Sequence, residues 1–145
     1  MKLDEKTTNE LNQMLKSCAT LSHLEDTLTE LPDKDRLTLK AYLEEMLQKK
    51  GCNKADVIRE ANLARTYGYQ IFQGERLASR DKLIALAVAM GMNLEECNRL
   101  LTIAQAGILY SKNRRDAILI FGFEKGLSFI DMNELLYEMG EDVLE

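Results

Sequence analysis

The stretch that decides the fold runs from residue 51 to residue 96 and reads GCNKADVIREANLARTYGYQIFQGERLASRDKLIALAVAMGMNLEE. Apolar residues recur in it at helical spacing, and residues that begin or end helices separate the runs. Asn53 is a good N-cap, and Asn62 can adopt the left-handed conformation that a tight turn needs. The stretch predicts three helices, over residues 54–61, 65–73 and 80–90, the last two ended by Gly74 and Gly91.

Helical signals continue on both sides of this stretch. Asn93 and Glu96 are spaced as a capping box and predict a helix over 94–106 that Gly107 ends. We expect further helices over 4–18, over 24–31 after a capping box of Ser22 and Glu25, from Asp33 or Asp35 to Lys50, over 114–125 after Asn113, and over 129–139 after Ser128. No segment alternates polar and apolar residues with period 2, so no sheet is expected, and no internal repeat is evident.

The chain is therefore predicted to be all-α, in three parts. Residues 1–35 form an N-terminal helical extension, residues 36–107 a central helical domain, and residues 108–145 a C-terminal helical pair with an acidic end. With 145 residues, of which 46% are apolar, the chain can bury one modest core. The last residues, 141–145, lie beyond Gly140, and we expect their deletion to be harmless.

Net charge is −5, which argues mildly against a nucleic-acid partner, but the charge is unevenly distributed. Residues 1–53 carry 8 basic and 10 acidic side chains, residues 54–115 carry 10 and 6, and residues 116–145 carry 1 and 8, so the net charges are −2, +4 and −7. The positive charge lies in the middle of the chain. Because a DNA-binding surface needs a local basic face rather than a basic chain, this distribution is compatible with DNA.

The chain lacks the residue patterns that are typical of disulfide-rich proteins, zinc proteins, enzymes and membrane proteins. Cys18, Cys52 and Cys97 have neither the number nor the spacing of a disulfide or zinc framework, and we interpret them as small apolar fillers. His23 is the only histidine, and no phosphate-binding glycine loop or nucleophile elbow is present, so no enzyme, cofactor or metal site is expected. No run approaches the ~18 apolar residues that span a bilayer, and the polar N-terminus is unlike a signal peptide. We expect a cytoplasmic protein without a membrane partner.

Residues 51–92 resemble the Cro and phage-repressor-like, xenobiotic-response-element (XRE) helix-turn-helix family. The matching pieces are residues 53–62, 63–76 and 79–96, with Gly74-Glu75-Arg76 and Ser79-Arg80-Asp81-Lys82-Leu83 fitting best. The resemblance extends over residues 36–107, about half of the chain. It implies a lambda-repressor-like five-helix domain, and a sequence-specific DNA-binding transcriptional regulator as the function.

In the arrangement that this resemblance implies, the helix over 65–73 lies in the major groove of double-stranded DNA. Arg65 is suited to guanine and Gln70 to adenine. Thr66 and Lys54 are suited to phosphates, and residues in the following loop and helix are placed to hold the DNA backbone. The implied DNA-binding residues are Lys54, Arg65, Thr66, Tyr69, Gln70, Gln73, Arg76, Arg80 and Lys82.

The proposed recognition helix also has unusual features. Gly68 interrupts it at a cost of about 1 kcal/mol relative to alanine, so we expect a packing reason, such as room for Tyr67, Tyr69 or Phe72 to fold into the core. The aromatic, glycine-interrupted helix and the acidic C-terminus favour an alternative function. In that alternative the helix-turn-helix fold is a protein-interaction module that has lost its DNA contact.

Two apolar faces have no place in a minimal five-helix domain: Leu11, Met14, Cys18 and Leu21, and Phe129, Met132, Leu136 and Met139. At least one is expected to be shared in a homodimer, because such regulators bind two half-sites. The apolar run 117–123 and the final helix are expected to pack as a hairpin on the core, to bind a protein partner, or both. The basic cluster at 112–115 could contact phosphate, but we interpret it as solvated charges at a helix start.

Overall fold

The computed structural model describes residues 12, 13, 16, 20 and 38–145. Met1–Leu37 and Thr38–Glu145 form two separate units, and all the helices named below belong to the second. The expected N-terminal extension has helices over 4–18 and 24–31 and an apolar face from Leu11 to Leu21. Apart from residues 12, 13, 16 and 20, it lies outside the described residues.

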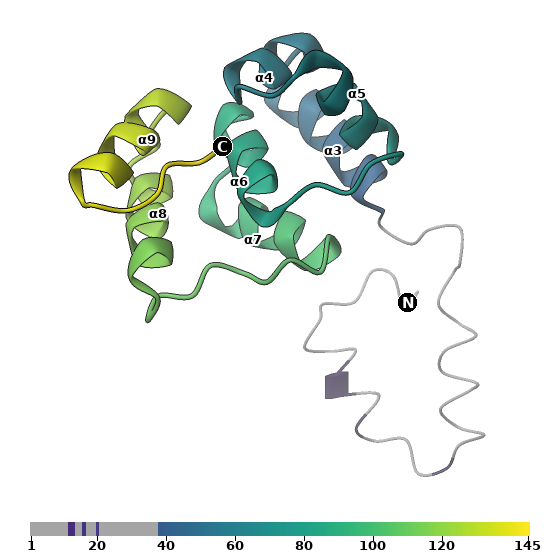
Figure 1. The fold of residues 1–145 in the computed structure, drawn as a ribbon. Helices are drawn as coiled ribbons and strands as arrows, with labels where there is room; N and C mark the ends of the chain where they lie inside the picture. The colour runs from purple at the N-terminus through teal and green to yellow at the C-terminus, as the bar shows by residue number, and fades with distance from the viewer. Residues whose placement is uncertain (1–11, 14–15, 17–19, 21–37) are drawn as a thin grey trace. The chain divides into compact units, whose positions relative to one another are not determined.

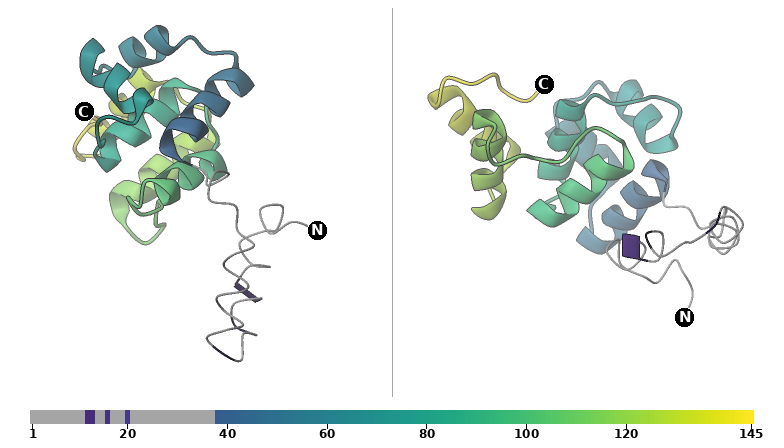
Figure 2. Two further views of the ribbon diagram at one scale, coloured as in Figure 1. Left: turned by 90° about the vertical axis from the view of Figure 1, so that its right-hand side faces the viewer. Right: turned by 90° about the horizontal axis from the view of Figure 1, so that it is seen from below.

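The second unit is all-helical, as predicted, and no strand occurs between residues 38 and 145. Its helices are α3 (Leu39–Lys50), α4 (Lys54–Glu60), α5 (Arg65–Gln73), α6 (Arg80–Ala89), α7 (Leu94–Ile103), α8 (Arg114–Glu124) and α9 (Phe129–Glu138). Figure 1 and the right-hand view of Figure 2 show α6 and α7 in the middle, with α3–α5 on one side and α8–α9 on the other. The packing agrees, since α4 contacts α6, α3 contacts α7, and α8 and α9 contact α7 and α6.

Two helix boundaries differ from the prediction by more than one residue. The first turn of α3 follows Thr38 rather than Asp33 or Asp35, because the Thr38 hydroxyl accepts the backbone N–H of Ala41 at 3.1 Å. Helix α7 ends at Ile103, three residues early, because Gln105 has a left-handed φ of 56°. The predicted N-caps Asn53, Asn93, Asn113 and Ser128 are confirmed, and so is the capping box of Asn93 and Glu96.

One apolar core runs through the unit, with fully buried side chains from α3 through α9. The apolar face of the last helix belongs to this core. Phe129, Met132 and Leu136 are 7%, 0% and 0% exposed, and only Met139, at 44%, stays largely outside. The expectation that this face is spare is therefore wrong for its first three residues, because they pack against the chain's own helices.

The structure reveals an internal repeat that the sequence analysis missed. Residues 80–110 and 115–145 correspond at a constant offset of 35, and α7 and α9 have equivalent bounds. The turn before the second helix of each repeat contains a residue with positive φ, 73° at Gly91 and 65° at the equivalent Gly126. The turn after that helix also contains one, 56° at Gln105 and 75° at the equivalent Gly140. Seven of the 31 positions are identical, too few to stand out: Arg80/Arg115, Asp81/Asp116, Gly91/Gly126, Asn98/Asn133, Leu100/Leu135, Leu101/Leu136 and Leu109/Leu144.

Each repeat fixes its own last residues in the same way. The side-chain oxygen of Asn98 accepts the backbone N–H of Leu109 at 3.0 Å, and that of Asn133 accepts the N–H of Leu144 at 2.7 Å. Both leucines are buried, at 4% and 2% exposure. Residues 141–145 therefore pack as part of the fold, which argues against the expectation that their deletion is harmless.

The two repeats exchange ion pairs at their first residues. Arg80 pairs with Asp116, and Arg115, which is equivalent to Arg80, pairs with Asp81, which is equivalent to Asp116. In the same reciprocal way α6 contacts α9 and α7 contacts α8. Two copies related by a local two-fold axis make reciprocal contacts of this kind. The hairpin α8–α9 is therefore a second copy of α6–α7 that packs on the first by approximate two-fold symmetry.

Candidate nucleic-acid interface

The predicted interface is built on α4, a tight turn and α5. Helix α4 begins at Asn53, whose side-chain oxygen accepts the N–H groups of Ala55 and Asp56 at 2.9 and 3.3 Å. The chain reverses at Asn62, which has the predicted left-handed φ, 58°. Helix α5 then begins at Arg65 with no side-chain cap and no acidic residue in its first turn. Its first N–H groups are consequently open to an anion.

Gly68 allows α5 to approach α4 closely. A Cβ atom built on Gly68 would lie 2.5 Å from Cγ2 and 2.8 Å from Cγ1 of Ile58, too close for any larger residue without a shift. The glycine therefore has the packing reason that the sequence led us to expect. The reason differs from the predicted one, since it is contact with Ile58 rather than room for the aromatic side chains of α5.

The outer face of α5 carries most of the predicted DNA-binding residues. Arg65, Thr66 and Gln73 are exposed, whereas Tyr69 and Gln70 are half-buried. The Arg65 guanidinium lies 5.8 Å from the centroid of the Tyr69 ring, within the range of a cation–π contact. This contact holds the Arg65 side chain along the exposed face of the helix.

The loop after α5 adds Arg76, which contacts Tyr67 of α5, a residue that the sequence analysis did not assign to the interface. The Arg76 guanidinium lies 5.3 Å from the centroid of the Tyr67 ring, and Nη1 donates to the side-chain oxygen of Gln70 at 3.4 Å. The Tyr67 hydroxyl donates to the carbonyl of Leu77 at 3.4 Å, so Tyr67 helps to fix this loop. In the sequence, two tyrosines lie between the arginines at positions 65 and 76, and this pattern could have assigned Tyr67 to the candidate interface.

Both basic residues of α4 are already paired. The Lys54 ammonium lies 2.8 Å from a carboxylate oxygen of Glu44 and 5.4 Å from the centroid of the Phe72 ring, and Arg59 lies 2.8 Å from Asp56. Ion pairs that remain partly exposed to water are weak. Lys54 can exchange Glu44 for a phosphate, and it therefore stays in the candidate interface, as does half-buried Lys82 in the first turn of α6.

Arg80 is not free to hold phosphate, and that prediction is corrected. Its guanidinium donates to the carbonyls of Gly107 and Ile108 at 3.1 and 2.9 Å, and to both carboxylate oxygens of Asp116 at 3.0 and 2.8 Å. These bonds use four of the five N–H groups of the side chain. Burial would raise the pKa of Asp116, but hydrogen bonds from Arg80 and the backbone of Tyr110 lower it, so the carboxylate stays ionised. Arg80 joins the two repeats.

The basic cluster at residues 112–115 likewise faces the chain's own C-terminus. Arg115 donates to both carboxylate oxygens of Asp81 at 2.9 Å and to the carbonyl of Asp142 at 3.0 Å. Arg114 pairs with Glu141 at 2.7 Å. These two arginines were expected to be solvated charges. They instead hold the last residues of the chain against α6 and α8.

No group of three or more histidine, cysteine, aspartate or glutamate side chains within the described part of the chain is placed to hold a metal ion. Across the same residues, every helix is too short or too polar to cross a bilayer. Cys97 is buried, and burial raises the pKa of its thiol to about 12, so it remains a protonated apolar filler. Cys52 is also free and is half-buried.

The structure thus brings most of the predicted DNA-binding residues together on α5 and the loop after it, and it removes one residue from the candidate interface. Arg65, Thr66, Tyr69, Gln70, Gln73 and Arg76 lie on α5 and the loop after it, Lys54 and Lys82 lie at the starts of the adjoining helices, and Arg80 is engaged elsewhere. No protein-family model, curated protein or solved structure matches the chain.

Proposed function

We propose that the chain is a sequence-specific DNA-binding transcriptional regulator with a lambda-repressor-like helix-turn-helix domain, in which α5 is the recognition helix. The observation that carries this proposal is the uncapped start of α5, where Arg65 and Thr66 are exposed. Free N–H groups at a helix start suit a phosphate, and an arginine beside them suits a guanine edge. The resemblance of residues 51–92 to the XRE family supports the same function.

Base reading is assigned to two residues. Arg65 donates two N–H groups to the acceptors of a guanine, and Gln70 pairs with an adenine. In the free protein Gln70 accepts a hydrogen bond from Arg76. Binding therefore requires Arg76 to turn from Gln70 toward a phosphate, which frees the amide of Gln70 for a base.

Few cations remain for the phosphates. With Arg80 engaged, they are Lys54, Arg76 and Lys82, and the hydroxyl of Thr66 adds a neutral contact. Each neutralised phosphate contributes about −0.9 to the slope of log K against log salt, so we expect a slope of about −3 per subunit. The acidic hairpin α8–α9 does not oppose this, because α6 and α7 lie between it and α3–α5 (Figure 1).

Selection of duplexes from a random double-stranded DNA library by the full chain at low salt tests the proposal. On the selected duplex, Arg65→Ala is expected to cost on the order of 1–3 kcal/mol and to relax specificity at one position. Lys54→Ala is expected to weaken all duplexes alike and to reduce the salt slope by about 1. Arg99→Ala removes an arginine that is also exposed, from α7, and is the matched control, for which we expect no change.

The alternative function also has an observation in its favour. Leu77, in the loop after α5, is 93% exposed, and the half-buried Tyr67 and Tyr69 lie on the same helix–loop segment. An apolar surface of this kind suits a protein partner. If no duplex is enriched at low salt, or if Arg65→Ala and Arg99→Ala weaken DNA binding equally, the DNA proposal fails and this alternative takes its place.

The proposed regulator acts as a homodimer, because helix-turn-helix regulators gain specificity from two half-sites about one turn of DNA apart. Exposed apolar residues that can take part include Leu77, Ile108 and Tyr110, which are 93%, 53% and 57% exposed. Light scattering at micromolar concentration tests this. A strict monomer that selects a single, non-palindromic half-site would contradict it.

A further inference from the structure

The second repeat exposes apolar side chains at positions where the first is polar. Ile130 and Tyr137 in α9 are equivalent to Glu95 and Thr102 in α7, and all four positions are exposed. Ile130 is 69% exposed and Tyr137 is 79% exposed. Since the first repeat folds with a glutamate and a threonine at these positions, packing does not require the apolar residues. Exposed apolar residues that the fold does not require indicate an interaction surface.

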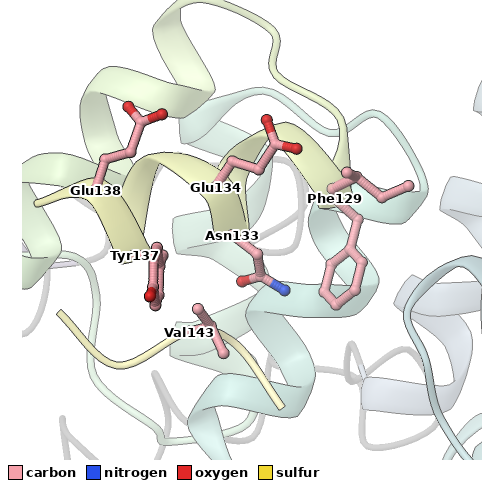
Figure 3. A pocket seen from close by; sticks show the side chains of 7 residues that line it. Phe129, Asn133, Glu134, Tyr137, Glu138 and Val143 are labelled. Carbon is pink, nitrogen blue, oxygen red and sulfur yellow. The ribbon is translucent and has the colours of Figure 1, made fainter. Parts of the chain in front are cut away.

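These side chains line one groove between α9 and the end of the chain. Figure 3 shows Tyr137 beside Val143 of the C-terminal segment, with Asn133 further along the helix. Ile130 of α9 also lines this groove. Asn133 exchanges two hydrogen bonds with the backbone of Leu144, at 2.7 and 3.3 Å. The far wall of the groove is therefore fixed to α9, and the groove is present before any partner binds.

The rim of the groove is acidic. Glu134 and Glu138 lie along the outer side of α9 (Figure 3), and no basic side chain lines the groove. In the first repeat, the position of Glu134 is occupied by Arg99. The second repeat therefore has an acidic side chain where the first has a basic one, in addition to its two apolar side chains at positions that are polar in the first. Residues 116–145 as a whole carry 8 acidic and 1 basic side chains.

We propose that this groove binds a segment of a partner protein that carries apolar side chains flanked by lysine or arginine. The apolar side chains fill the space beside Ile130, Tyr137 and Val143, and the basic residues pair with Glu134 and Glu138. The site lies on the hairpin remote from α5 and does not depend on DNA binding. It gives the chain a protein partner that is recruited while α5 remains free.

A second copy of this chain is the less suitable occupant. Two such grooves facing one another would place Glu134 and Glu138 of one copy against those of the other, and like charges at close range are unfavourable. A partner of opposite charge gains from the same field, both in rate of association and in affinity.

The test uses the full chain and a library of displayed peptides. Peptides are selected on the wild-type chain and counter-selected on the double variant Ile130→Glu/Tyr137→Thr, which carries the residues of the first repeat. We expect enrichment of sequences with lysine or arginine beside apolar residues. A synthetic peptide of the enriched sequence should bind the wild type, by fluorescence anisotropy, at least about tenfold more tightly than the double variant.

Two further variants separate the contributions. Glu134→Arg should weaken the peptide by about tenfold and reduce its salt dependence, whereas Thr102→Ala, at the position equivalent to Tyr137, should leave binding unchanged. Both are exposed positions, and circular dichroism checks that each variant is folded. Equal binding of the peptide to wild type and Glu134→Arg would overturn the proposal. So would a wild-type dimer, seen by light scattering, that the double variant dissociates, because the occupant would then be a second copy.

Discussion

Arg80 binds both carboxylate oxygens of Asp116, at 3.0 and 2.8 Å, and joins the start of α6 to the start of α8. The equivalent pair, Arg115 and Asp81, joins the same two helices in the opposite sense. The two pairs are equivalent in sequence but not in burial, since the Asp116 side chain is 8% exposed and that of Asp81 is 34% exposed. The cost of losing a charge partner grows with burial, so the two pairs should differ in strength.

Asp116→Ala is expected to lower the free energy of unfolding by about 3 kcal/mol, because it leaves Arg80 without its carboxylate at a mostly buried position. Asp81→Ala should cost about 1 kcal/mol, because that pair is more hydrated. Urea denaturation followed by circular dichroism measures both. Equal losses would show that burial does not set the strength of these pairs.

Arg80→Ala should lower stability while leaving the salt slope of DNA binding unchanged, since Arg80 makes no phosphate contact in the proposed complex.

Gly68→Ala is expected to destabilise the fold by about 2 kcal/mol, although alanine favours helices, because the new Cβ would overlap the Ile58 side chain. The matched variant Ile58→Ala also destabilises, by creating a cavity. In the double variant the overlap disappears, so the combined loss should be smaller than the sum of the two single losses. Additive losses in urea denaturation would show that the two side chains do not meet.

Leu144→Ala is expected to lower the free energy of unfolding by about 2–4 kcal/mol, because Leu144 is 2% exposed near the end of the chain. Deletion of residues 141–145 should cost more, since it also removes the partners of Arg114, Arg115 and Asn133. Glu145→Ala, at the exposed neighbouring position, is the control and should be neutral. Thermal unfolding of the three variants decides whether the C-terminal segment belongs to the core.

Local signals in the sequence predicted the helices of the second unit well. Asn53, Asn93, Asn113 and Ser128 each cap a helix because a short polar side chain can bind a free N–H group without help from the rest of the fold. Gln105 was missed, because glutamine has little intrinsic preference for the left-handed conformation and adopts it here only at the end of α7. The end of that helix was therefore placed too late.

Relations between distant residues were the main failure. The repeat was not recognised in the sequence because its seven identities are scattered over 31 positions. It is evident from contacts in the structure, where Arg80 pairs with Asp116 and Arg115 pairs with Asp81. For the same reason Arg80 was predicted to face DNA, since a sequence shows that an arginine is present but not which carboxylate reaches it. The exposure of Arg65 and Thr66 on α5 agrees with their assignment to DNA contact, because position on a short helix is a local property.

Acid should destabilise the fold through Glu96. Its carboxylate accepts hydrogen bonds from Lys49 at 2.9 Å and from the backbone of Asn93 at 2.9 Å, and pairs with Lys50 at 2.8 Å. Burial would raise the pKa of Glu96, but these partners lower it from 4.5 to about 2. A carboxyl group with a lowered pKa in the folded state contributes stability that is complete above its unfolded pKa and is lost as pH falls through the folded value. The contribution is on the order of 3 kcal/mol, lost progressively between about pH 5 and pH 1.

Comparison of the wild type with Glu96→Gln isolates this contribution from those of other carboxylates. Glutamine keeps the size of the side chain and does not titrate, so the variant should be less stable than the wild type near neutral pH. The difference in the free energy of unfolding between the two proteins should shrink as the pH falls, because protonation removes the negative charge from the wild type as well. Urea denaturation across this pH range measures the difference. A difference that stays constant with pH would mean that Glu96 keeps an ordinary pKa and that Lys49 and Lys50 contribute little to holding α3 against α7.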